Sequence, residues 1–233
     1  MRERLKNPQA ESLIEVEPAA RAPVRRRPPP RPRADASSRQ LSLFGVEAVP
    51  PAPEDLAGLL AGPGQVVRMG GTARVSVVVE ELWRARVLVS EFTLRGLSAT
   101  CVPTADEHIG VRTAYAASLA PLAGTWLRGA LKVPPPGFVL DGRRLRLWAA
   151  AGGSRDALGF TLRLGPSDEP AWEQVGAALA GIGLPAVLLG PDAGGPAYRI
   201  SGQRRLDRLA ELVGDTPADT PPDAWPIRWS SGP

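Results

Sequence analysis

Few residues of this chain are suited to covalent chemistry. There is one histidine, His108, and one cysteine, Cys101, so a disulfide pair and a cysteine-based zinc site are excluded. Serine catalysis would use a Gly-x-Ser-x-Gly turn, which does not occur, and the glycines at 62–64 and 194–195 lack the Lys-Ser/Thr sequel of a phosphate-binding loop. His108 is predicted at a loop or strand edge and Cys101 in the core. We therefore expect no catalytic residue, no metal site and no cofactor.

Recognition chemistry is better represented, and it is concentrated near the N-terminus. Residues 1–53 contain ten Arg or Lys against six Asp or Glu, while the remainder is balanced, so the net charge of +4 belongs to this segment. Its Pro- and Arg-rich composition predicts a disordered arm. The arm nevertheless contains an apolar cluster, which has no core of its own to join and consists of Gln40, Leu41, Ser42, Leu43 and Phe44.

These five residues resemble the peptide with which bacterial polymerases and repair factors bind the ring-shaped sliding clamp, the beta subunit of DNA polymerase III. A chance match is expected about once in several thousand sequences of this length. The resemblance implies that Leu43 and Phe44 enter a hydrophobic pocket of the clamp, with Leu41 beside them and Gln40 hydrogen-bonding at the rim. The alternative is that the cluster packs on this protein's own domain.

Length and composition predict one folded domain with a tail on either side. A chain of 233 residues, 43% of them hydrophobic, can bury one sizeable core. We assign residues 1–53 to the arm, 54–214 to the domain and 215–233 to a Pro-rich tail, in which Trp225 and Trp229 either cap the domain or bind a partner. No run approaches membrane-span length, and the first residues lack a secretion signal. A cytoplasmic, nucleoid-associated protein without a membrane partner is expected.

Apolar periodicity over residues 54–214 predicts an α+β domain in which one unit, αββαββα, occurs twice. The first copy is expected to have helices at 54–61, 81–96 and 113–122 and strands at 65–69, 72–79, 98–102 and 108–112, with a Gly-Gly hairpin turn at 70–71. The second copy is expected to have helices at 124–132, 169–182 and 203–213 and strands at 143–148, 158–164, 186–190 and 197–201. Two copies of one unit predict a pseudo-twofold architecture.

Each expected copy opens with a helix of small residues, Leu56–Gly64 in the first and Leu127–Pro134 in the second. The first resembles the LAGLIDADG sequence that names a family of homing endonucleases. The overall spacing, especially Trp126-Leu127-Arg128-Gly129-Ala130 and the helix-strand-strand-helix run from 169 to 213, resembles the degenerate LAGLIDADG domain of the WhiA sporulation regulators. In the family two such helices pack backbone to backbone at the pseudo-dyad, so the resemblance implies that Gly58 and Gly129 lie at this contact. An ordinary α+β domain with a Leu-Ala-Gly helix is the alternative.

Two departures from the family bear on activity. Its nucleases hold their metal with a carboxylate at the end of each of these helices, where this chain has Pro63 and Pro134, with Ala61 and Lys132 two residues earlier. Proline cannot bind Mg²⁺ or position water, so we predict no endonuclease activity by this route. WhiA proteins also carry a helix-turn-helix module after the repeat, whereas this sequence continues into a short Pro-rich tail.

The family resemblance implies a saddle of two sheets whose concave face lies along duplex DNA. Strand alternation predicts which side chains occupy that face, because neighbouring residues of a strand point to opposite sides. The arginines that alternate with apolar residues on the expected strands are Arg74, Arg144, Arg146 and Arg163. We predict that they contact phosphates and guanine edges; a merely solvated sheet face is the alternative.

The combined prediction is a noncatalytic accessory protein of bacterial DNA replication or repair. Its arm would bind the sliding clamp, and its LAGLIDADG-like domain would contact double-stranded DNA or a further partner. Two alternatives remain open. One is a clamp-recruited DNA nuclease with metal ligands elsewhere, and the other is a pure protein adaptor that joins the clamp to a polymerase or repair enzyme without touching DNA.

Overall fold

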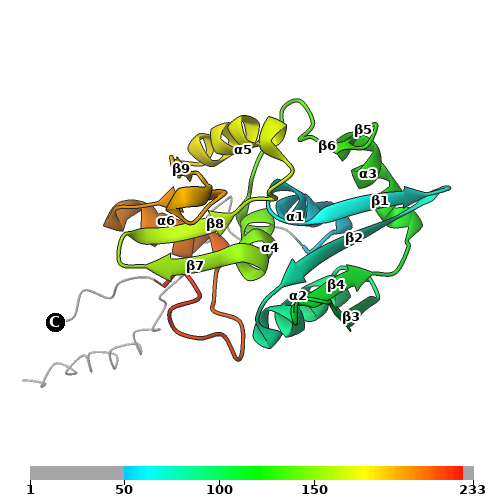
Figure 1. The fold of residues 1–233 in the computed structure, drawn as a ribbon, viewed down its shortest axis with the longest axis horizontal. Helices are drawn as coiled ribbons and strands as arrows, with labels where there is room; N and C mark the ends of the chain where they lie inside the picture. The colour runs from blue at the N-terminus through cyan, green and yellow to red at the C-terminus, as the bar shows by residue number, and fades with distance from the viewer. Residues whose placement is uncertain (1–49, 228–233) are drawn as a thin grey trace, which may run out of the picture. The chain divides into compact units, whose positions relative to one another are not determined.

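The computed structural model describes residues 50–227, which form two four-stranded sheets on either side of a central pair of helices (Figure 1). The five residues at 40–44 and Trp229 lie outside the described residues. Among residues 50–227, none of the helices has the combination of length and apolarity that a membrane crossing requires.

The first copy has the element order that the sequence predicts. Its elements are η1 (Pro53–Leu56), α1 (Ala57–Ala61), β1 (Gln65–Met69), β2 (Thr72–Val79), α2 (Leu82–Leu94), β3 (Ala99–Pro103), β4 (Ile109–Thr113), η2 (Ala117–Leu119) and α3 (Ala120–Trp126). The strands pair antiparallel in the order β1-β2-β4-β3. Gly70 has φ +59° in the β1–β2 turn, a conformation that glycine adopts without a steric cost. The predicted hairpin is therefore confirmed.

The second copy repeats the first. Its elements are α4 (Gly142–Gly152), β7 (Gly153–Asp156), β8 (Gly159–Arg163), α5 (Glu169–Gly181), β9 (Val187–Leu189), η3 (Pro191–Ala193), β10 (Ala197–Ile200) and α6 (Gln203–Val213). The strand order β7-β8-β10-β9 is that of the first sheet, because each copy places its fourth strand between its second and third. The predicted pseudo-twofold repeat is confirmed, and β7 is a strand that the sequence reading missed.

The predicted start of the second copy is wrong. The helix expected over 124–132 does not form, because α3 ends at Trp126 and the chain continues into the hairpin of β5 (Leu127–Arg128) and β6 (Leu131–Lys132). Gly129 lies in the turn of this hairpin with φ +63°, and a Cβ added there would meet no atom within 4 Å. It is therefore not the helix-contact glycine that the sequence suggested.

The strand expected over 143–148 is also wrong, because these residues belong to α4. Asp141 is the N-cap of this helix: its carboxylate accepts a hydrogen bond of 2.9 Å from the amide of Arg144. Leu145 and Leu147 alternate with arginines in the manner of a strand, yet both leucines are fully buried. A helix packed on several sides buries residues all round, so its apolar residues do not follow one helical face.

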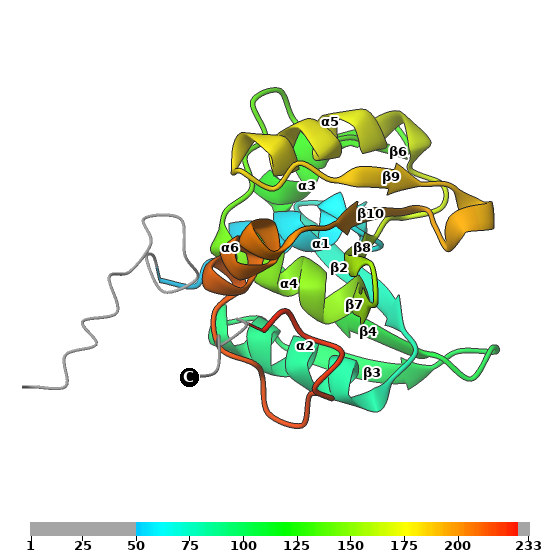
Figure 2. The same cartoon turned by 90° about the vertical axis from the view of Figure 1, so that its left-hand side faces the viewer.

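The two helices at the centre, α1 and α4, are packed backbone to backbone. A Cβ added at Gly58 would overlap the carbonyl oxygen of Arg144, and one added at Gly62 would overlap the indole of Trp148. The role predicted for Gly58 is thus confirmed. In Figure 2, α4 lies among α1, α2 and α6, all of which pack against it. This central position joins both copies in one hydrophobic core.

The predictions for Trp225 and Cys101 also have outcomes. Trp225 caps the domain: its side chain is fully buried, its Nε1 donates to the Gly214 carbonyl (3.3 Å), and the Arg146 guanidinium lies 5.2 Å from its ring centre. Cys101 is on β3 as expected but is exposed, so its prediction as a core residue is wrong. It lies on the outer strand of the sheet, where the surface remains accessible.

Candidate nucleic-acid interface

Each sheet has one face turned to the core and one face turned away from it, which we call the open face. On β2, Val75, Val77 and Val79 are buried, whereas Arg74 and Ser76 alternate with them on the open face. On β8 the buried residues include Phe160 and Leu162, and the open-face residues are Thr161 and Arg163. The alternation that the sequence predicted for these two strands is therefore confirmed.

The structure adds two arginines to the open faces. Arg112 on β4 pairs with Ser76, and Arg199 on β10 pairs with Thr161. Ser76 lies on β2 and pairs with Gln65 of β1, and Thr161 lies on β8 and pairs with Ser154 of β7, so each is on the second strand of its copy and pairs with the first. Arg112 and Arg199 therefore occupy equivalent positions in the two sheets. The sequence contained the signal, because Arg112 follows Val111 and Arg199 lies between Tyr198 and Ile200.

The arginines of the open faces have different neighbours. Arg74 lies over the ring of Tyr115, with its guanidinium carbon 4.8 Å from the ring centre. Arg199 forms an ion pair of 2.7 Å with Asp156. Arg163 forms an ion pair of 2.5 Å with Glu80, which follows β2, so this contact crosses from one copy to the other. These pairs are at least partly exposed, and a phosphate can compete for such a guanidinium.

Arg144 and Arg146 do not lie on an open face, because they belong to α4. Arg144 donates to the Val139 carbonyl and lies 3.6 Å from the Asp141 carboxylate. Arg146 binds Glu91 (2.6 Å) and the carbonyl of Asp215 (2.7 Å). The strand geometry that suggested DNA contacts for these two side chains is therefore wrong, and both make contacts within the domain.

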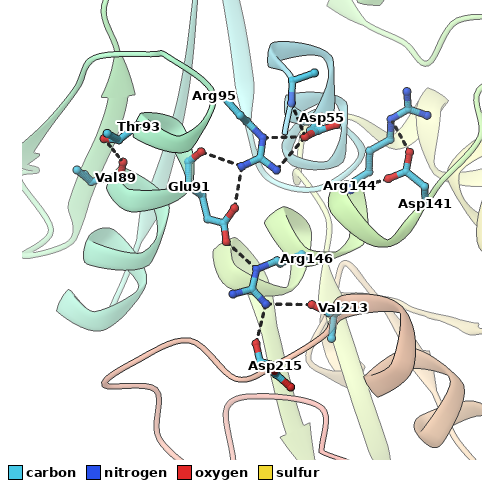
Figure 3. A network of polar contacts seen from close by, with 11 residues as sticks. Asp55, Val89, Glu91, Thr93, Arg95, Asp141, Arg144, Arg146, Val213 and Asp215 are labelled. Carbon is cyan, nitrogen blue, oxygen red and sulfur yellow. Dashed lines mark hydrogen bonds and ion pairs between the residues drawn. The ribbon is translucent and has the colours of Figure 1, made fainter. Parts of the chain in front are cut away.

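A buried ionic network joins the two copies near the N-terminal half of the helix pair (Figure 3). Arg95 binds Asp55 (2.9 Å) and Glu91 (2.7 Å), and Glu91 binds Arg146 through its other oxygen. Burial alone would raise the pKa of Glu91, but the hydrogen bonds and charges of Arg146 and Arg95 outweigh it and leave this pKa below its ordinary value of 4.5. We call this network of Asp55, Glu91, Arg95 and Arg146 the closed end.

A buried cation caps the C-terminal end of each central helix. Lys132 donates to the carbonyls of Gly62 (2.8 Å) and Gly64 (2.6 Å) and pairs with Asp168 (2.7 Å). Burial lowers the pKa of Lys132, and Asp168 offsets only part of this effect. Arg84 has the same role at the end of α4. Its guanidinium pairs with Glu81 (2.5 Å) and donates hydrogen bonds to the carbonyls of Ala149, Ala150 and Gly153. The C-terminus of a helix carries partial negative charge, which a cation stabilises. Lys132 and Arg84 therefore stabilise the C-terminal ends of α1 and α4 without a metal.

The ends of the helix pair do not fit a divalent ion. A Cβ added at Gly152 would lie 3.5 Å from the ring of Pro63, so these residues, and not Pro63 and Pro134, face each other across the pseudo-dyad. Neither has a carboxylate, and hard cations such as Mg²⁺ need oxygen ligands. Three acids near these ends are paired with basic side chains: Glu80 with Arg163, Glu81 with Arg84 and Asp168 with Lys132. Residues 50–227 also contain no group of three or more His, Cys, Asp or Glu that could hold a metal.

A cavity of about 530 Å³ opens between the two sheets, beside the ends of the helix pair. It is reached from the open faces, because Ser76 of β2 and Arg163 of β8 both line it. We call it the midline cavity, and the residues that give it its character are Pro63, Gln65, Ser76, Glu80, His108 and Arg163. His108, predicted at a loop or strand edge, lies just before β4.

Comparison with known proteins supports the fold. No protein-family model and no curated protein matches the chain. The homing endonuclease I-WcaI bound to its DNA recognition sequence superposes with a TM-score of 0.54 at 13% identity, over 75% of this chain and 84% of that chain. Full-length DUF199/WhiA from Thermatoga maritima superposes with a TM-score of 0.51 at 13% identity, over 70% of this chain and 55% of that chain, so this protein spans about half the length of that relative. Residues 50–227 have the two-repeat α+β fold of LAGLIDADG proteins.

Proposed function

We propose that this protein is a noncatalytic accessory factor of bacterial DNA replication or repair. In this proposal the open faces of the domain bind duplex DNA, and residues 40–44 of the arm bind the sliding clamp. The observation that carries the DNA part is the presence of two arginines on the open face of each sheet: Arg74 and Arg112 on the first, Arg163 and Arg199 on the second.

The symmetry of these arginines fits the symmetry of the ligand. The phosphate backbones of duplex DNA are themselves related by twofold axes, and Arg112 and Arg199 occupy equivalent positions in the two sheets. Each sheet can then contact one backbone, and phosphate contacts of this kind fix position without reading sequence. Charge outside the arm is balanced, which supports weak and salt-sensitive binding rather than tight recognition.

The absence of carboxylates at Pro63 and Gly152 supports a noncatalytic role. A nuclease of this fold that used metal at the pseudo-dyad would need acids there, and this chain has an imino acid and a glycine. The DNA contact would thus serve retention rather than cleavage. We assign this role to residues 54–214, with 1–53 as the recruiting arm and 215–233 as the tail, and place the protein at the nucleoid in the cytoplasm.

The clamp part of the proposal rests on the sequence of residues 40–44. Burying Leu43 and Phe44 in an apolar pocket is worth about 3 to 6 kcal/mol before ordering costs, which gives roughly micromolar affinity for a short peptide. Attachment to a clamp on DNA raises the effective concentration of the domain at that DNA. Weak binding by the open faces then suffices.

A fluorescence anisotropy titration with a labelled 30-base-pair duplex tests the DNA contact. We expect affinity to fall steeply with salt, and the Arg112→Ala/Arg199→Ala variant to bind about tenfold or more weakly. The matched control is Arg86→Ala/Arg204→Ala, which removes two exposed arginines from helices α2 and α6. Equal affinities of the two double variants would refute the assignment to the open faces, and a full chain that binds no duplex would favour the pure adaptor.

The clamp contact is tested with the full chain and purified clamp. Leu43→Ala/Phe44→Ala should weaken binding by about a hundredfold or more, because both anchoring side chains are removed. Ser42→Ala, which keeps both anchors, is the control. A full chain and a Leu43→Ala/Phe44→Ala form of equal affinity would remove the clamp from the proposal.

A nicking assay on supercoiled plasmid with Mg²⁺ or Mn²⁺ tests the noncatalytic assignment. No cleavage above that of the metal alone is expected. Cleavage that Glu80→Gln abolishes would instead favour the nuclease alternative, with a carboxylate of the midline cavity in its active site, because Glu80 lines that cavity.

A further inference from the structure

The midline cavity has the size and position of a binding site on the DNA-facing surface. Its volume of about 530 Å³ is in the range of small-molecule sites, roughly 300 to 1,000 Å³. Gln65, Ser76 and Val78, which belong to the open face of the first sheet, line it together with Arg163 from the open face of the second. A duplex lying across both open faces would pass over its mouth.

The polar groups of the cavity combine acceptors and donors at one place. Glu80 and Arg163 are joined by an ion pair of 2.5 Å, so an acidic acceptor and a guanidinium donor lie side by side. The hydrogen bond from Arg163 lowers the pKa of Glu80 below its ordinary value, which keeps the carboxylate ionised at neutral pH. Gln65, Ser76 and His108 add groups that donate and accept. The edge of a nucleobase presents the same alternation of donors and acceptors.

The remaining walls are apolar and suit a flat ring. The apolar residues that line the cavity include Pro63, Pro166, Pro196, Val77 and Leu164. Such walls can sandwich a planar base, as in enzymes that receive a base turned out of the helix. Pro63 and Gly152 at the pseudo-dyad add no carboxylate to this space, so Glu80 is the one acid among its lining residues, and its charge is paired with Arg163.

The geometry points to a nucleobase as the ligand of the midline cavity. Specifically, we infer that one base turned out of a duplex lying on the open faces enters the cavity and contacts Glu80 and Arg163. This inference rests on the proposed DNA binding and adds to it a preference for sites where a base pair is weak. An unpaired or mismatched base leaves the stack at a smaller cost than a paired one.

The probe is 2-aminopurine placed at the centre of a 30-base-pair duplex, whose fluorescence increases when the base leaves the stack. The cavity has no Trp, Tyr or Phe among its lining residues to quench the base. We expect a fluorescence increase on saturation with the full chain when 2-aminopurine stands opposite cytosine, and a smaller increase opposite thymine. The mismatched duplex should also bind about fivefold or more tightly.

A cavity-filling variant and a matched control separate capture of the base from binding of the duplex. Val78→Trp adds an indole to the lining of the cavity, and Val67→Trp adds one to the open face of β1, outside the lining residues. Both positions are exposed, so both variants should fold. Val78→Trp should abolish the mismatch preference measured as a difference in duplex affinity, whereas Val67→Trp should keep it. Far-UV circular dichroism checks that each variant is folded.

A second arm distinguishes a base in a strand from a free nucleotide. Nucleoside monophosphates added at millimolar concentration should bind far more weakly than the duplex, and a nucleotide that binds equally well would overturn capture from DNA in favour of a free-nucleotide site. Failure of the inference is distinct from failure of the proposed function. Duplex binding without any increase in 2-aminopurine fluorescence refutes base capture alone, whereas no duplex binding at any salt concentration refutes both.

Discussion

The closed end and the midline cavity use charged residues in opposite ways. At the closed end, Arg95 has no exposed side-chain surface and Glu91 is 7% exposed, and each contacts two partners. At the midline cavity, the side chains of Arg163 and Glu80 are 57% and 46% exposed and pair mainly with each other. A charge that is satisfied inside the protein supports the fold, while a charge at an open surface is available to a ligand. The charges of the closed end therefore serve to hold the fold together, whereas those of Arg163 and Glu80 are placed where a ligand can reach them.

The largest effect on stability is expected at the contact between α1 and α4. Gly58→Val should destabilise the domain by about 3 kcal/mol or more, because its Cβ would overlap the backbone of Arg144 and force α1 away from α4. Urea unfolding followed by tryptophan fluorescence measures this loss. Gly124→Ala on α3 is the control: a Cβ there meets no atom within 4 Å, so stability should be unchanged or higher by up to about 1 kcal/mol.

The same substitution at the two ends tests the comparison directly. Glu91→Gln should cost about 3 to 5 kcal/mol, because it leaves Arg95 and Arg146 buried with one shared partner weakened. Glu80→Gln should change stability by less than about 0.5 kcal/mol, since its ion pair is half exposed. Similar losses in urea unfolding for both variants would show that the ends do not differ as we describe.

The pH dependence of stability should differ between these variants as well. The pKa of Glu91 in the folded protein is below its ordinary value of 4.5. The ionised carboxylate therefore contributes fully to the stability of the fold above pH 4.5, and this contribution is lost as the pH falls through the pKa of the folded protein. The full chain should therefore lose stability below about pH 4.5, and Glu91→Gln should show a shallower loss. Unfolding midpoints between pH 3 and 7 measure this, and parallel curves would contradict the role of Glu91.

An intermediate effect is expected where a buried cation caps α1. Lys132→Met should destabilise by about 2 to 4 kcal/mol, because Asp168 then lacks its counterion and the carbonyls of Gly62 and Gly64 lack their donor. Lys132→Met/Asp168→Leu should recover part of this loss, since an apolar pair removes the unpaired charge. If the double variant is less stable than the single one, Asp168 has a role beyond pairing.

The smallest effect is expected for a single arginine of the open face. Arg163→Ala should leave stability within about 0.5 kcal/mol of the full chain but weaken duplex binding about threefold to tenfold, with a smaller salt dependence. Arg86→Ala on α2, whose side chain is 63% exposed, should affect neither quantity. An Arg163→Ala variant that loses stability and keeps DNA affinity would place Arg163 in the scaffold.

Most elements of the fold could be predicted from the sequence because their signals are local. The glycine turn between β1 and β2, the alternation of Val75, Val77 and Val79, and the helix that begins at Glu169 depend only on neighbouring residues. The start of the second copy was missed because α4 is surrounded by other helices. Burial on several sides removed the one-sided pattern by which a helix is recognised.

The candidate site was predictable only in part. Arg74 and Arg163 follow from strand alternation, and the same rule extends to Arg112 and Arg199. That Arg146 binds Glu91, and that Glu80 meets Arg163 across the two copies, depends on contacts between residues far apart in the chain.

By itself, the sequence determined the doubled order of elements, the glycine at the helix contact, the basic arm with its apolar pentapeptide and the lack of an acid at Pro63. Only the tertiary structure decided that Gly152 is the residue opposite Pro63, that Lys132 and Arg84 cap the two helices, and that a cavity lies where the sheets meet. The physical reason is the distance along the chain over which each kind of interaction acts. Backbone preferences and periodicity act over a few residues, whereas pairing of buried charges and close helix packing depend on how distant segments meet.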